Sequence, residues 1–159
     1  MYNYKINKIL IRNHSTRRHF IGCFPADKLP AYSFFKTATK FPICLVVNTD
    51  TANKPGEHWV AIYIEGANRV EYFDSLALWP PISVHILKLL SNFANVRTLN
   101  TPVQSPFATT CGYHVCYFLL QRCAGHSFQQ IVERLYKLNN SDEYVRDTLS
   151  RAIFNHGIH

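Results

Sequence analysis

The chain has no apolar run that approaches the roughly 20 residues of a membrane-spanning helix, so we expect no membrane partner. Its opening residues, MYNYKINKILIRNHSTRRHF, lack the apolar stretch and small-residue cleavage site of a signal peptide. These absences predict an intracellular, reducing location, in the nucleus or the cytoplasm. Internal repeats, low-complexity tracts and linkers are also lacking, so we expect one domain over residues 1–159.

Paired cysteine motifs are missing as well. The five cysteines stand at 23, 44, 111, 116 and 123, an odd number with no Cys-x-x-Cys pair, which favours reduced thiols over a disulfide framework. A zinc site would need clustered ligands at finger-like spacing. Cys111, His114 and Cys116 are close in sequence, but on one helix they would point in different directions. We therefore expect no metal ion and no other cofactor.

Acidic residues are scarce in the first quarter of the chain. Residues 1–40 hold eight Lys or Arg and one acid, Asp27, whereas residues 41–159 hold nine basic and nine acidic side chains. The net charge of +7 therefore lies entirely in residues 1–40. Such a patch favours a polyanion, nucleic acid above all, and Arg12, Arg17, Arg18 and Lys28 are the candidate DNA contacts. The alternative is a solvated face that aids solubility.

Apolar periodicity and turn-forming residues predict an α+β domain with a small, mainly antiparallel sheet covered by helices. Residues 24–42, with three prolines, are expected to be irregular. Ser127 and Ser141 are expected to cap the last two helices. The expected helices cover 2–12, 82–94, 112–123, 128–138 and 142–154, and the expected strands cover 43–48, 59–65, 69–73 and 96–99.

Strands 59–65 and 69–73 flank the turn EGAN and predict a hairpin. In a register with facing positions that sum to about 133, Trp59 faces Asp74 and His58 faces Ser75, so His58 lies diagonal to Asp74. An imidazole beside a carboxylate at a sheet edge can form the general base and orienting acid of a catalytic triad. The alternative is a structural ion pair on the surface.

Cys111 stands where a polar loop becomes an apolar helix. The positive end of the helix dipole and its unpaired N–H groups favour a thiolate there, and Gly112 is expected to leave room for a substrate. The side-chain amide of Gln104, with the backbone N–H of Cys111, could donate to a developing oxyanion. The alternatives are a buried packing cysteine and a solvated loop glutamine.

Four segments have a characteristic order: FIGCF (20–24), CLVVNTDTANKPGEHWVAIYI (44–64), YFDS (72–75) and QSPFATTCGYHVC (104–116). Together they resemble the adenovirus proteinase family of cysteine proteases and, more distantly, the proteases of SUMO-like modifiers. The resemblance covers residues 20–125 and implies a papain-like architecture. It implies His58 as general base, Asp74 as its orienter, Cys111 as nucleophile and Gln104 as oxyanion donor. Trp59 and Gly112 would line the substrate channel.

The same resemblance implies a cysteine endopeptidase that cleaves viral capsid or core precursors during maturation, after a small residue such as Gly. It further implies stimulation by DNA, a location in the host nucleus and the virion, and a source in an adenovirus-like virus or a large DNA transposon. An activating viral peptide is also implied, without a disulfide link, because residues 75–110 contain no cysteine. The alternatives are a deconjugase of ubiquitin-like or SUMO-like modifiers and a basic nucleic-acid-binding structural protein without catalysis.

Overall fold

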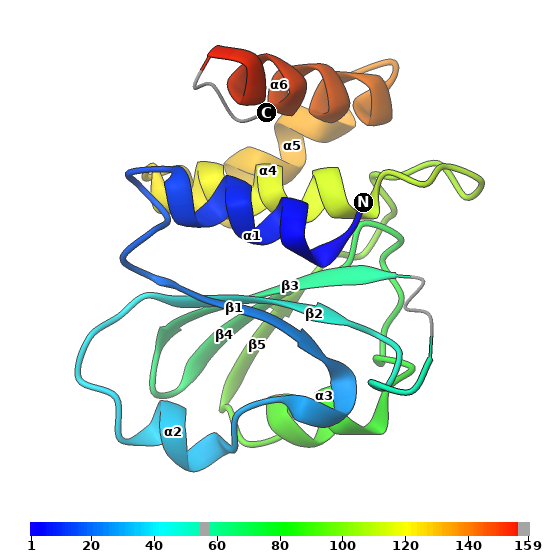
Figure 1. Cartoon of the computed structure of the whole chain (residues 1–159). Helices are drawn as coiled ribbons and strands as arrows, with labels where there is room; N and C mark the ends of the chain where they lie inside the picture. Colours follow the sequence, from blue (N-terminus) through cyan, green and yellow to red (C-terminus); the bar gives the residue numbers. More distant parts are fainter. Residues whose placement is uncertain (55–57, 156–159) are drawn as a thin grey trace.

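The computed structural model describes residues 1–54 and 58–155, in which one five-stranded sheet lies between two layers of helices (Figure 1). Helices α4 and α1 cover one face, with α5 and α6 beyond α4, and α2 and α3 cover the other (Figure 1). The predicted α+β class is thereby confirmed. The elements are α1 (Asn3–Arg12), β1 (Phe20–Pro25), η1 (Ala26–Lys28), α2 (Tyr32–Lys36), β2 (Ile43–Asn48), β3 (Trp59–Gly66), β4 (Arg69–Phe73), α3 (Val84–Leu90), β5 (Asn95–Thr98), α4 (Cys111–Cys123), α5 (Phe128–Tyr136) and α6 (Ser141–Asn155).

The five strands follow one another in the order β1-β2-β3-β4-β5. The two inner pairings, β2 with β3 and β3 with β4, are antiparallel, and the two outer pairings are parallel, so the sheet is mixed. All six residues of β2 are buried because both faces of the sheet are covered by helices, and this explains its continuous apolar sequence, ICLVV. No helix in the described residues is both long and apolar enough to cross a membrane.

Strand β1 and the short helices η1 and α2 were not predicted, and the expectation that residues 24–42 are irregular is therefore wrong in part. In β1 only Phe20 is buried, Gly22 has a φ of 137°, and Pro25 ends the strand. Gly and Pro are depleted in strands, so the local sequence carries a weak strand signal. Pairing with the buried strand β2 holds β1 in place.

The hairpin formed by β3 and β4 has a register one residue away from the predicted one. Ala61 pairs with Phe73 and Ile62 with Tyr72, so facing positions sum to 134. The difference arises at the turn, where Gly66 pairs with Arg69 and an irregularity follows between Ile64 and Gly66. Extended past the strand ends, the observed register places positions 58 and 74 on the same side of the pleat, which the predicted register did not.

The last two helices begin differently from each other. Helix α5 starts with a capping box between Ser127 and Gln130, and the prediction of Ser127 as its cap is confirmed. For α6 the predicted cap, Ser141, is wrong. The side-chain oxygen of Asn140 accepts the backbone N–H of Glu143 at 3.1 Å, and the hydroxyl of Ser141 donates instead to the carbonyl of Val103. The start of α6 is thereby fastened to the residue that precedes Gln104.

Candidate active site

His58 and Asp74 lie at one edge of the sheet, where β3 begins and β4 ends. The Nε2 of His58 is 2.7 Å from the Oδ1 of Asp74. Asp74 is 3% exposed, and its Oδ1 also accepts the backbone N–H of Leu76 at 2.9 Å, which fixes the carboxylate. Burial lowers the pKa of His58, but the hydrogen bond to Asp74 and the nearby Cys111 thiol outweigh this and raise the pKa to about 9.

Cys111 is the first residue of α4, and its thiol is near enough to His58 for each group to shift the pKa of the other. Because Asp74 engages Nε2, the ring nitrogen left for the thiol is Nδ1. Burial raises the pKa of Cys111, but the nearby His58 ring and the backbone N–H groups of Trp59 and Gly112 lower it below its ordinary value overall. A thiol with a lowered pKa beside an imidazole with a raised pKa favours a thiolate–imidazolium pair.

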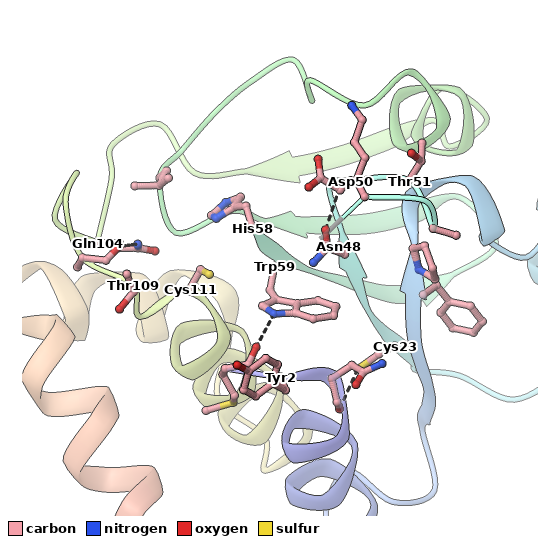
Figure 2. Close-up of a pocket in the computed structure, with 18 residues that line it drawn as sticks. Tyr2, Cys23, Asn48, Asp50, Thr51, His58, Trp59, Gln104, Thr109 and Cys111 are labelled. Carbon is pink, nitrogen blue, oxygen red and sulfur yellow. Dashed lines mark hydrogen bonds between the residues drawn. The ribbon is translucent and has the colours of Figure 1, made fainter. Parts of the chain in front are cut away.

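Gln104 is buried, and its amide has a fixed orientation. Its Oε1 accepts the hydroxyl of Ser75 at 2.5 Å, and its Nε2 donates to the carbonyl of Ala108 at 2.7 Å. An amide nitrogen carries two N–H groups, so a second one remains for a ligand. Gln104 lines the same cavity as Cys111 and His58 (Figure 2).

The role of Ser75 was not predicted from the sequence. Ser75 is fully buried, its hydroxyl holds the amide of Gln104, and its carbonyl accepts the backbone N–H groups of Val103 and Gln104 at 2.9 and 3.0 Å. Ser75 thus connects the residue next to Asp74 to the loop that carries Gln104. A short polar residue directly after the predicted acid was the one available signal.

The cavity has a volume of about 600 Å³ and extends from Cys111 past Trp59 toward Tyr2 and Cys23 (Figure 2). Trp59 lines it, as the resemblance implied. The indole Nε1–H of Trp59 donates to the carbonyl of Met1 at 2.9 Å. Residues Met1–Asn3, Asp50 and Lys54 also line the cavity and were missed, because no local pattern in the sequence connects them to the hairpin.

Gly112 does not have the predicted place in the substrate channel. It is buried and is not part of the cavity wall. A Cβ at this position would lie 2.8 Å from the Cβ of Met1, so the space beside Gly112 is filled by Met1. The small residue therefore permits a close approach of the chain to itself, and the expectation of room for a substrate is wrong.

The predicted basic residues lie outside the cavity and do not form one group. Arg12 ends α1, Arg17 and Arg18 lie in the turn before β1, and all three are exposed. Lys28, also exposed, ends η1 beyond the other end of β1. At about 3.3 Å per residue, β1 separates Lys28 from the arginines by roughly 20 Å. Within residues 1–54 and 58–155, no group of three or more His, Cys, Asp or Glu side chains could hold a metal ion.

Comparisons with known proteins identify a fold. No family model matches the sequence, and no curated protein matches it. Among solved structures, the central domain of the uncharacterized Lpg1148 protein from Legionella pneumophila has a TM-score of 0.57, with 14% identity over 98% of both chains. The ASFV pS273R protease has a TM-score of 0.50 and 22% identity, over 86% of this chain and 64% of the protease. The chain therefore shares its α+β fold with the central domain of Lpg1148 and with part of the ASFV pS273R protease.

Proposed function

We propose that this chain is a cysteine peptidase with Cys111 as the nucleophile. The observation that carries the proposal is the arrangement of three residues: Asp74 is hydrogen-bonded to His58, and His58 and Cys111 lie at the wall of one cavity that Gln104 also lines. Cys111 at the start of α4 and a base oriented by a buried carboxylate are the arrangement that nucleophilic catalysis requires. A packing cysteine would need neither His58 nor Asp74.

The reaction would proceed in two stages, formation of a thioester and its hydrolysis. The Cys111 thiolate attacks a peptide carbonyl, a C–S bond forms, and the oxyanion accepts hydrogen bonds from the free N–H of Gln104 and the backbone N–H of Cys111. Protonated His58 then gives its proton to the leaving nitrogen, the C–N bond breaks, and a thioester remains. In the second stage His58 takes a proton from water, the hydroxide attacks the thioester, and the carboxylate product and the Cys111 thiolate are released.

The finer proposal is an endopeptidase that cuts after a small residue such as Gly. Trp59 lies beside Cys111 in the cavity wall and is fixed by its bond to Met1, so the cavity next to the nucleophile would favour a residue without a bulky side chain. The resemblance of the four sequence segments to the adenovirus proteinases supports viral capsid or core precursors as substrates. It also supports the nucleus and the virion as sites of action.

A peptide probe that ends in a Gly vinyl methyl ester would test the proposal. The vinyl group should form a covalent adduct with Cys111 in the wild type, and the Cys111→Ala variant should form none. Cys116→Ala is the matched control, because Cys116 is fully buried in the same helix and should leave labelling unchanged. An adduct at another cysteine, or none at all, would exclude the proposal. Faster reaction with Gly-Gly-terminated modifier proteins than with capsid-type peptides would indicate a deconjugase instead.

A further inference from the structure

Residues 104–110 form the loop that carries Gln104 and ends at Cys111, and both ends of this loop contact one carboxylate. The Oδ2 of Asp142, in the first turn of α6, accepts the backbone N–H of Ser105 at 3.0 Å. Its Oδ1 accepts the hydroxyl of Thr110. Ser105 follows Gln104 directly and Thr110 precedes Cys111 directly, so Asp142 clamps the loop next to each of the two proposed reactive residues.

A third contact fixes Asp142 itself. The Nε2 of His114, a fully buried residue of α4, lies 3.0 Å from the Oδ1 of Asp142. Among residues 1–54 and 58–155, the buried Nδ1 of His114 has no hydrogen-bond partner, which fits a neutral ring whose only proton is on Nε2 and points to the carboxylate. Burial lowers the pKa of His114 against the opposing effect of Asp142, which agrees with that neutral state.

The negative charge of Asp142 is stabilised by hydrogen bonds and by the helix dipole. It accepts three hydrogen bonds, and it lies at the positive end of the α6 dipole, where a carboxylate is stabilised. Burial raises the pKa of Asp142, but the bonds from Thr110, His114 and Ser105 outweigh this and lower it. The carboxylate is therefore ionised and can accept at both oxygens.

The loop has separate supports on its two sides. Ser75, next to Asp74, holds Gln104 from the side of the sheet, and Asp142 holds Ser105 and Thr110 from the side of α6. The lining of the active-site cavity does not include Asp142, which lines a second cavity with Ser105 and Phe107. Asp142 therefore lies outside the wall of the first cavity, and its contacts connect it to the proposed reactive residues through the loop.

We propose that Asp142 is a positioning residue of the active site, which holds loop 104–110 so that the amide of Gln104 and the thiol of Cys111 keep a fixed relative placement. This inference rests on the proposed peptidase function for its catalytic consequence. The clamp itself is a structural claim that can be measured in a protein of any function.

Amide hydrogen exchange of the full chain tests the clamp. Asp142→Ala should accelerate exchange at Ser105 by about 10-fold or more, with a smaller change for Asp142→Asn, which keeps one acceptor oxygen. Asp147→Asn is the matched control, because Asp147 is an exposed acid of the same helix, and it should leave the loop unchanged. Thr110→Val removes one donor to Asp142 without altering α6 and should also accelerate exchange. Unchanged exchange at residues 104–110 in the Asp142 and Thr110 variants would overturn the proposal.

Peptide cleavage tests the catalytic consequence. Asp142→Ala should lower kcat about 10- to 100-fold with KM changed less than about threefold, since displacing a preorganised donor acts on the transition state. Gln104→Ala should lower kcat by about 100-fold. If Asp142 acts through Gln104, the double variant should be no slower than Gln104→Ala alone, whereas independent effects would multiply. The alkylation rate of Cys111 should change less than about threefold, because it needs the thiolate and no oxyanion donor.

The outcomes separate the two proposals. The positioning role is supported if exchange in the loop is faster, kcat is lower, and the double variant of Asp142 and Gln104 is no slower than Gln104→Ala alone. Faster exchange with a wild-type kcat, or a double variant in which the effects multiply, overturns it while the peptidase assignment stands. If the wild type cleaves no peptide, the proposed function fails instead, and the exchange result alone decides whether Asp142 holds the loop.

Discussion

His58 lies between a carboxylate and a thiol, and both partners favour its protonated form. Asp74 accepts from Nε2 at 2.7 Å, and the thiol of Cys111 lies near the same ring and raises its pKa. The pKa of His58 rises to about 9, and the pKa of Cys111 falls, against the opposing effect of burial on each. These opposite shifts favour a thiolate–imidazolium pair, in which no proton needs to move before the thiolate attacks.

The pH dependence of alkylation and of cleavage should therefore differ. The rate of Cys111 alkylation by iodoacetamide should rise with pH and then reach a plateau. The midpoint of this rise should lie below about 8.5, the pKa of a free thiol. The kcat/KM for a peptide should rise with the thiolate but fall again near pH 9, where His58 loses the proton that the leaving nitrogen needs. His58→Ala should move the alkylation midpoint upward. A midpoint that His58→Ala leaves in place would contradict the ion pair.

Replacing the base should cost more than replacing its orienter. His58→Ala should lower kcat/KM on the order of 10⁵-fold, and Asp74→Asn should be roughly 10- to 100-fold milder, because Asp74 only fixes the ring and stabilises its charge. Steady-state peptide cleavage measures both variants, with circular dichroism to verify the fold. His85→Ala is the control, since His85 is an exposed histidine of α3. Wild-type turnover in His58→Ala would remove this residue from the mechanism.

At the scale of secondary-structure elements, the sequence predicted those helices and strands whose signal lies in their own residues. Strand β2 was predicted with its observed bounds because its apolar run is continuous, and α5 was predicted because an amphipathic pattern follows Ser127, which the structure shows in a capping box. The hairpin register was off by one residue because the turn contains an irregularity before Gly66. Strand β1 was missed because only Phe20 in it is buried, so its pairing partner and not its own sequence defines it.

The junction between α4 and the start of the chain gives an element-scale prediction. Gly112→Ala places a Cβ 2.8 Å from the Cβ of Met1, so Met1 must move and its bond to the indole of Trp59 should break. We expect a shifted Trp59 emission spectrum in a Trp79→Phe background and a KM raised about threefold or more. Gly66→Ala is the control, because its Cβ would meet no atom of the described part of the chain within 4 Å. An unshifted spectrum would show that Met1 does not fix Trp59.

At the scale of the whole molecule, the site is assembled from parts that no sequence window spans. His58 and Asp74 could be paired from the sequence because one hairpin joins them, and Gln104 and Cys111 because one loop does. Met1 beside Gly112 and Asp142 beside Thr110 could not, because each contact depends on how helices pack across the sheet or on one another. The separation of the basic residues could not be predicted either, because it depends on β1, which lies between Arg17 and Arg18 at one end and Lys28 at the other.

The charge distribution predicts DNA binding away from the cavity. Residues Met1–Asn3 line the cavity, and α1 then runs ten residues, about 15 Å, to the exposed Arg12. Contacts of Arg17 and Arg18 with phosphate should release counterions, so neutralising both should reduce the slope of log affinity against log salt by about two. Lys28→Gln should change the slope less, because Lys28 lies at the other end of β1. Fluorescence anisotropy with unrelated duplexes at several salt concentrations measures this.

Cleavage of a short free peptide should be unaffected by the two arginine substitutions. An absence of DNA binding even at low salt would remove this proposal and leave the peptidase assignment standing. Binding that survives with an unchanged salt slope would place the phosphate contacts on other basic residues of the chain.

The most direct test of the central claim is N-terminal sequencing of the products formed from candidate capsid precursors by the wild type and by Cys111→Ala. The wild type should generate new N-termini that follow a small residue. Cys111→Ala should generate none, with a melting temperature within about 3 °C of the wild type. Cys116→Ala should still cleave at the same bonds, although its lost packing lowers stability. The same new N-termini from Cys111→Ala, at the rate of the wild type, would contradict the account.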